Sequence, residues 1–159
     1  MPIINLTTEI NAPIEICFDL SRSIDLHVIS TAKTNEKAIA GITKGLININ
    51  ETVTWQATHF GIKQKLTSKI IAFDRPTFFV DTQIKGIFKS MIHHHKFEQI
   101  EDNTIMVDIF EYQSPLGFLG KFIDKIILTG YLKQLLIDRN RTIKEFAESE
   151  KWKLVLSSN

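Results

Sequence analysis

The chain has 159 residues, with 19 basic and 18 acidic side chains and a net charge of +1. We expect one domain, 1–159, because this length can bury a core without the support of metal ions or disulfides. The balanced charge excludes a strong electrostatic attraction to nucleic acid or anionic lipid. A single cysteine, Cys17, excludes an internal disulfide.

The N-terminal segment MPIINLTTEI lacks the basic start, apolar centre and cleavage site of a signal peptide. No apolar run approaches the ~20 residues that span a bilayer. We therefore expect a cytoplasmic protein without stable membrane insertion. Eleven Phe against two Tyr and two Trp suit a thick core or an apolar cavity wall.

The first elements are a strand and two short helices. Residues 3–10 are rich in β-branched side chains, which predicts a strand. Short helices are expected at 11–22, with Asn11 as N-cap, and at 23–31, with Ser23 as N-cap.

From about residue 38 to 113 the hydrophobic pattern has period two, which is typical of strands. The predicted strands are 38–41, 45–49, 51–60, 62–73, 77–86, 88–100 and 104–114. Short turns join them, at 74–76 and 101–103 for example, so we expect an antiparallel meander.

From residue 116 the period becomes helical and continues to 147. An unbroken helix of that length would measure ~48 Å, longer than a domain of this size, which is ~40 Å across. We therefore predict a bend or break near 117–120 or at Gly130. The pattern leaves the tail, 151–159, open.

Four segments carry a resemblance to a known family: VTWQATHFGIKQKLTSKI, FVDTQIKGIFKSMIHHHKFE, NTIMVDIFEYQSPLGFLGKFID and YLKQLLIDRN. In this order they resemble SRPBCC proteins of the START-like superfamily, in particular the polyketide cyclase/dehydrase group. The resemblance implies an α+β helix-grip fold, in which a curved antiparallel sheet of six to seven strands wraps a long C-terminal helix. It also implies a deep ligand cavity between them. The superfamily contains both carriers and enzymes, so the fold constrains the function poorly.

Three histidines, His93, His94 and His95, lie in the middle of a predicted strand. Alternation places His93 and His95 on one face, and His94 on the other face toward solvent. A hairpin through 101–103 would set four pairs opposite each other: Met91 and Tyr112, His93 and Phe110, His95 and Asp108, Phe97 and Met106.

The face that carries His93 and His95 has three interpretations. The two side chains are satisfied polar groups of the sheet, with His95 paired to Asp108 across the strands, or they orient the polar group of a ligand, or they bind a metal ion with Asp108 as the third ligand. The metal interpretation is disfavoured because the three residues lie on adjacent strands of a flat sheet. We therefore expect no metal and no other cofactor.

Four further residues have simpler expected roles. Asp81 is expected to face solvent, and Arg139 to form a salt bridge with an acidic neighbour or, alternatively, to hold the anionic head of a ligand. Cys17 is expected to be buried and inert. For His59 the sequence leaves two alternatives open, a polar group in the cavity or a histidine at a strand end.

The leading hypothesis is a protein that binds a small hydrophobic molecule, such as a lipid, an isoprenoid or a polyketide-like compound. The expected apolar walls are Trp55, Met91, Phe97, Met106, Phe110, Phe122 and Ile126, and the expected polar groups are His93, His95, Asp108, Tyr112 and His59. One alternative is a cyclase, dehydratase or hydrolase with His95 and Asp108 as general base and orienting acid. Another is an accessory protein that docks a partner enzyme, and a homodimer also stays open; no nucleic-acid partner is expected.

Overall fold

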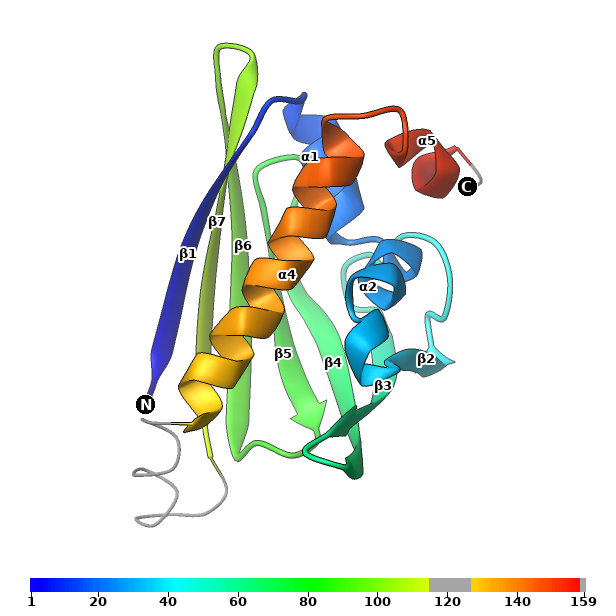
Figure 1. Ribbon diagram of the computed structural model, residues 1–159, viewed down its shortest axis with the longest axis vertical. Helices are drawn as coiled ribbons and strands as arrows, with labels where there is room; N and C mark the ends of the chain where they lie inside the picture. The colour runs from blue at the N-terminus through cyan, green and yellow to red at the C-terminus, as the bar shows by residue number, and fades with distance from the viewer. Residues whose placement is uncertain (115–126, 158–159) are drawn as a thin grey trace.

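The computed structural model describes residues 1–114 and 127–157, and in this part a seven-stranded antiparallel sheet curves around one long helix (Figure 1). The strand order is β1-β7-β6-β5-β4-β3-β2. The strands are β1 (Ile3–Ile10), β2 (Lys37–Gly41), β3 (Thr52–His59), β4 (Ile62–Asp74), β5 (Phe78–Lys85), β6 (Ser90–Ile100) and β7 (Asn103–Gln113). The helices are α1 (Ile14–Ser21), α2 (Ile24–Ser30), the short 3-10 turn Ala32–Thr34, α4 (Thr129–Ala147) and α5 (Trp152–Leu156). The predicted α+β helix-grip architecture is confirmed.

The period-two segments become strands because alternate residues enter the core. On β7, every second residue from Thr104 to Tyr112 is buried, and the residues between them are half-buried. One predicted strand, 45–49, is wrong. This segment bonds to the helical region instead: Gly45 donates its N–H to the Asp25 carboxylate at 2.8 Å and accepts the N–H of Ile24 at 2.9 Å.

The two short helices are confirmed, but only one of their predicted caps is. Ser23 caps α2 by accepting the N–H of Leu26 at 3.1 Å. The N-cap position of α1 is occupied by Pro13, so the expectation for Asn11 is wrong. Asn11 lies two residues earlier and donates its backbone N–H to the Glu148 carboxylate instead.

Helix α4 crosses the concave face of the sheet, next to α1 and α2 (Figure 1). Its 19 residues give a length of about 28 Å, which fits a domain of this size. Gly130 is the second residue of α4 and follows two π-helical residues at 127–128, so the bend or break expected there stays a prediction. A glycine in a helix costs only about 1 kcal/mol, which the packing of the rest of α4 offsets. The predicted break at 117–120 and the predicted start at 116 lie outside the described residues.

The core lies between the sheet and the helices. Phe18 of α1 makes edge-on contacts with Phe73, Phe79 and Phe97, at ring centroid distances of 5.3 to 5.4 Å. The C-terminal tail adds α5, in which Val155 is buried against this core. Among the described residues, none of the helices combines the length and the apolar character needed to cross a membrane.

Candidate functional site

The sheet brings polar side chains of three strands together at its concave face. The predicted hairpin register is confirmed, with His93 opposite Phe110 and His95 opposite Asp108. On the other side of β6, Asp81 of β5 lies opposite His93. Because i and i+2 share a face of a strand, His93 and His95 both point inward between two carboxylates.

Asp108 holds both histidines from the β7 side. Its Oδ1 lies 2.9 Å from Nε2 of His93 and 3.2 Å from Nδ1 of His95. The two imidazole rings are neighbours, with centroids 3.7 Å apart. Asp108 is completely buried, so these contacts fix the rings without help from solvent.

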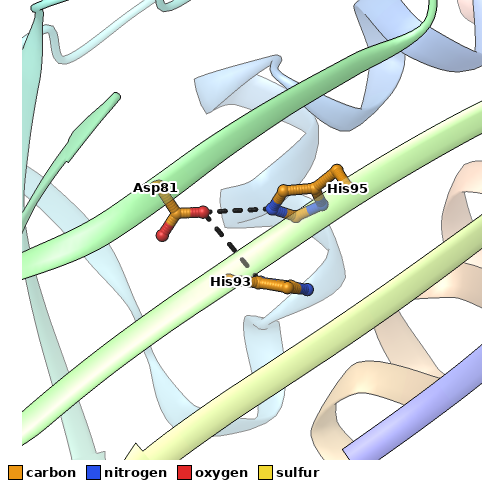
Figure 2. A group of neighbouring side chains, drawn as sticks. All are labelled: Asp81, His93 and His95. Atoms are coloured by element: carbon orange, nitrogen blue, oxygen red, sulfur yellow. Dashed lines mark hydrogen bonds and ion pairs between the residues drawn. The ribbon is translucent and has the colours of Figure 1, made fainter. Parts of the chain in front are cut away.

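Asp81 faces the histidines rather than solvent, so the expectation for this residue is wrong. Figure 2 shows its carboxylate next to both rings: Oδ2 is 3.0 Å from Nε2 of His95 and 4.0 Å from Nδ1 of His93. The physical reason is the pairing of β4 with β5, which shifts register twice and so obscures which residues of β5 face inward.

Helix α4 contributes a cation and an amide to the same cluster. Arg139 places Nη1 3.4 Å from Oδ1 of Asp108, and its Nη2 lies 3.5 Å from Nδ1 of His95 and donates to the Ser21 carbonyl at 3.1 Å. Asn140 donates to Oδ2 of Asp108 at 2.7 Å. The expected salt bridge of Arg139 with an acidic residue is thereby confirmed.

These contacts decide the charge states of the acidic groups. Burial raises the pKa of Asp108, but the hydrogen bonds from His93 and His95 and the charge of Arg139 outweigh it and hold the pKa well below its usual value. Burial also raises the pKa of Asp81, but its hydrogen bond with His95 and the nearby charge of Arg139 act against burial, and the pKa is lowered. Both carboxylates are therefore ionised at neutral pH.

His93 is neutral at the same pH. Burial and then the charge of His95 lower its pKa to about 4, against the opposing effect of the two carboxylates. A neutral ring donates through one nitrogen and accepts through the other. Since Nε2 donates to Asp108, Nδ1 is the nitrogen with a free lone pair, and it lies on the side of Asp81.

A cavity of about 190 Å³ opens above this cluster, between the sheet, the α1–α2 region and α4. Asp81, His93, His95 and Arg139 form its polar floor. A second polar pair, His27 and Glu36, lies elsewhere in the wall with 3.3 Å between Nε2 and Oε1. The apolar wall consists of Ile24, Ile47, Val53, Trp55, Leu66, Ile70, Phe79, Met91, Phe110 and Leu136.

The residues predicted from the sequence fall into three groups. Trp55, Met91, His93, His95 and Phe110 line the cavity, with Asp108 directly behind the histidines. Four others lie elsewhere: Phe97 and Met106 in the core, Tyr112 with its hydroxyl 2.8 Å from that of Thr129, and His59 with Nδ1 2.8 Å from the Tyr131 hydroxyl. Phe122 and Ile126 lie outside the described residues.

His59 therefore occupies the end of β3 and is no part of the cavity lining described here, which agrees with the strand-end alternative. Its partner Tyr131 lies in the first turn of α4, so the contact joins the helix to the sheet.

Several cavity residues were missed by the sequence analysis. Phe79 lies on the same face of β5 as Asp81, and its ring stacks on that of His95 with 4.1 Å between the centroids. A correct prediction of the inward face of β5 would therefore have included both Phe79 and Asp81. His27 and Glu36 carried no usable signal, because they come from a short helix and from a connection without periodicity.

No protein-family model and no curated protein matches this chain in sequence. Solved structures do resemble it. A protein of Thermus thermophilus aligns with a TM-score of 0.70 at 15% identity, over 89% of this chain and 97% of that one. The major latex-like protein 151 of Panax ginseng aligns at 0.67 and 15%, over 93% and 98%.

A third structure is a START superfamily protein from Mycobacterium smegmatis, with a TM-score of 0.69 at 12% identity over 92% of this chain and 97% of that one. These structural alignments cover almost the complete fold, whereas the sequence identities are too low to transfer a function. The chain therefore shares the helix-grip fold of these solved structures, one of which is a START superfamily protein.

Proposed function

We propose that the protein binds a small, mainly hydrophobic molecule in the cavity between the sheet and α4. The observation that supports this most is the composition of the cavity, in which a mainly apolar wall surrounds a few polar groups, most of them gathered at the floor. Such a combination is typical of sites that bury an apolar body and orient it through a few polar contacts.

The cavity volume limits the size of the ligand. About 190 Å³ is somewhat larger than the ~150 Å³ engineered cavity that accommodates benzene, and smaller than the ~300 Å³ at which drug-sized sites begin. The ligand class we propose is therefore a compound with a single ring or a short chain, such as a short lipid or a ten-carbon isoprenoid.

The floor gives the ligand an orientation. Phe79, Trp55 and Leu136 surround the apolar part, while Asp81 and His93 lie where a polar end would sit. A ligand lying with its apolar end against this floor would remove water from Asp81 and from the free nitrogen of His93 without offering a hydrogen bond, which costs free energy. We therefore expect alcohols, which can donate a hydrogen bond to Asp81, to bind better than the hydrocarbons of the same shape.

Calorimetric titration with geraniol, 1-octanol and decanoic acid tests the proposal. Trp55 lines the cavity and the other tryptophan is Trp152, so Trp152→Phe makes intrinsic fluorescence specific for the site. We expect saturable 1:1 binding of at least one compound, with a change in Trp55 emission. The proposal fails if none binds saturably and native mass spectrometry of protein from its own host shows no bound molecule.

A second candidate is an acid–base enzyme that acts on a molecule in the same cavity. One arrangement favours it: His95 lies between two carboxylates, 3.0 Å from Asp81 and 3.2 Å from Asp108. Carboxylates that orient an imidazole are a common device in general acid–base catalysis. Once a substrate is known, a His95→Ala variant with full turnover would exclude this candidate.

A further inference from the structure

We propose that Asp81, His93 and His95 form a binding site for a divalent transition-metal ion, such as Zn²⁺ or Fe²⁺, at the floor of the cavity. Each residue offers one ligand atom, and the three atoms lie within 4.8 Å of one another. Two imidazoles and one carboxylate suit first-row transition ions, whereas Mg²⁺ and Ca²⁺ prefer oxygen ligands alone.

The distances agree with those of a metal site. Bonds of about 2.0–2.2 Å to nitrogen and oxygen place neighbouring tetrahedral ligands about 3.4 Å apart. Oδ2 of Asp81 lies 3.0 Å from Nε2 of His95 and 4.0 Å from Nδ1 of His93. One of these distances is shorter and the other is longer than the expected separation of about 3.4 Å between two ligand atoms. Small side-chain rotations would therefore complete the coordination.

The far nitrogens of both rings are held in the way that metal-bound histidines require. A ligating imidazole generally bonds through its other nitrogen to a carboxylate or carbonyl, which fixes the ring orientation. Here one buried carboxylate serves both rings, with Oδ1 of Asp108 2.9 Å from Nε2 of His93 and 3.2 Å from Nδ1 of His95. The nitrogens left for the ion, Nδ1 of His93 and Nε2 of His95, both lie toward Asp81 (Figure 2).

The charges at the site permit a cation. Asp81 and Asp108 carry two negative charges, and Arg139 carries one positive charge, which leaves one net negative charge when both rings are neutral. Arg139 contacts Asp108 and the nitrogen of His95 that lies away from Asp81. Its guanidinium therefore lies on the far side of the histidines from the proposed ion.

The ion would keep an open coordination position. All three ligand residues line the cavity, so the position opposite the protein ligands faces the space proposed for the small molecule. Three protein ligands with a free position are typical of ions that bind a water or a substrate oxygen. The ion would then be the group that receives the polar end of the ligand, although its own binding does not depend on the proposed function.

This proposal differs from the metal site that the sequence analysis disfavoured. There the carboxylate was Asp108, in line with the two histidines on a flat sheet. Asp108 instead lies behind the rings, and Asp81 closes the site from the opposite strand. Three ligand atoms from two strands then lie within 4.8 Å of one another.

Zinc titration by calorimetry, on the full chain after EDTA treatment and dialysis, tests the proposal. We expect 1:1 binding with a dissociation constant of about 1 µM or lower, and Asp81→Asn to weaken it at least 30-fold. Asparagine keeps the shape of the side chain and can still accept a hydrogen bond from His95, so the substitution removes mainly the negative charge. Co²⁺ provides a second measurement, because its visible absorption bands report the coordination number.

The matched control is His94→Ala. His94 belongs to the same histidine run but lies on the opposite sheet face, so the variant should bind zinc as the wild type does. Zinc binding that is weaker than about 1 mM, that is unchanged in Asp81→Asn, or that is lost in His94→Ala would overturn the proposal. The titrations with geraniol, 1-octanol and decanoic acid are made without metal, so either proposal can fail alone.

Discussion

Asp108 of β7 accepts a hydrogen bond of 2.7 Å from Asn140 of α4, and this contact ties the long helix to the sheet beneath the cavity floor. The other oxygen of the same carboxylate serves His93, His95 and Arg139. One buried side chain thus connects the packing of the helix with the orientation of the candidate site.

Asp108→Asn should destabilise the protein strongly. In asparagine one of the two carboxylate oxygens is replaced by an NH2 group, which donates hydrogen bonds. In one orientation this NH2 group would face the donor Asn140, and in the other it would face the donors Arg139 and His93. It also leaves the buried Arg139 guanidinium without its counter-ion. We expect a loss of about 3–5 kcal/mol in the free energy of unfolding, measured with urea.

Asp138→Asn is the control for this measurement. Asp138 also lies on α4 but pairs with the exposed Lys33 and Arg141 at the surface, where an ion pair contributes less than about 1 kcal/mol. Equal losses in the two variants would contradict the role assigned to Asp108.

Leu136→Trp should block ligand binding. Leu136 of α4 lines the cavity and is half-buried, so a larger ring at this position would occupy the space proposed for the ligand. We expect at least a tenfold weaker dissociation constant for any ligand found, measured by calorimetry, with an unchanged circular dichroism spectrum.

The same substitution at an exposed leucine provides the comparison. Leu154 of α5 is 76% exposed and does not belong to the cavity lining described above, so Leu154→Trp should bind like the wild type. If Leu136→Trp also binds normally, the ligand does not occupy this cavity.

Cys17 should be unreactive in the folded protein and should lower stability at high pH. Burial raises the pKa of its thiol to about 11 from an ordinary value of 9.0. The thiolate is the reactive form, so we expect no reaction with Ellman's reagent at pH 8 until the protein unfolds.

The sign of the pH effect follows from the raised pKa. Below pH 9 the thiol is protonated in both states, and stability is unaffected. Between pH 9 and 11 the unfolded thiol ionises and the folded one does not, so this contribution to stability is lost as pH rises, by roughly 1 kcal/mol at pH 10. Urea unfolding of Cys17→Ala should lack this part of the decline, and identical pH profiles would contradict the expectation.

Phe18→Ala should cost about 3–5 kcal/mol of unfolding free energy, because it leaves a cavity within the aromatic cluster. Phe18 is completely buried and contacts three other phenyl rings. Phe60, which is 61% exposed, is the control, and Phe60→Ala should change stability by less than about 1 kcal/mol. Similar values for the two variants, measured by urea unfolding, would show that the cluster is not the centre of the core.

The part of the site on β6 and β7 could be predicted from the sequence, because the alternation of inward and outward residues is strict in these two strands. β6 and β7 alternate without interruption and join through a short turn, so the facing pairs followed from counting. β5 could not be assigned in this way, because its pairing with β4 shifts twice and polar residues occur on both of its faces. The inward position of Asp81 was therefore missed.

The sequence by itself determined the element order, the fold class and the inward face of the histidine run, since these depend on local periodicity. Only the tertiary structure decided which carboxylate meets which ring nitrogen, because that depends on strand register and on α4 packing across the sheet. The same holds for the cavity, whose wall combines residues as far apart in the chain as Ser21 and Arg139. Local patterns carry no information about such long-range contacts, which is why Asp81, His27 and Glu36 entered the site only with the fold.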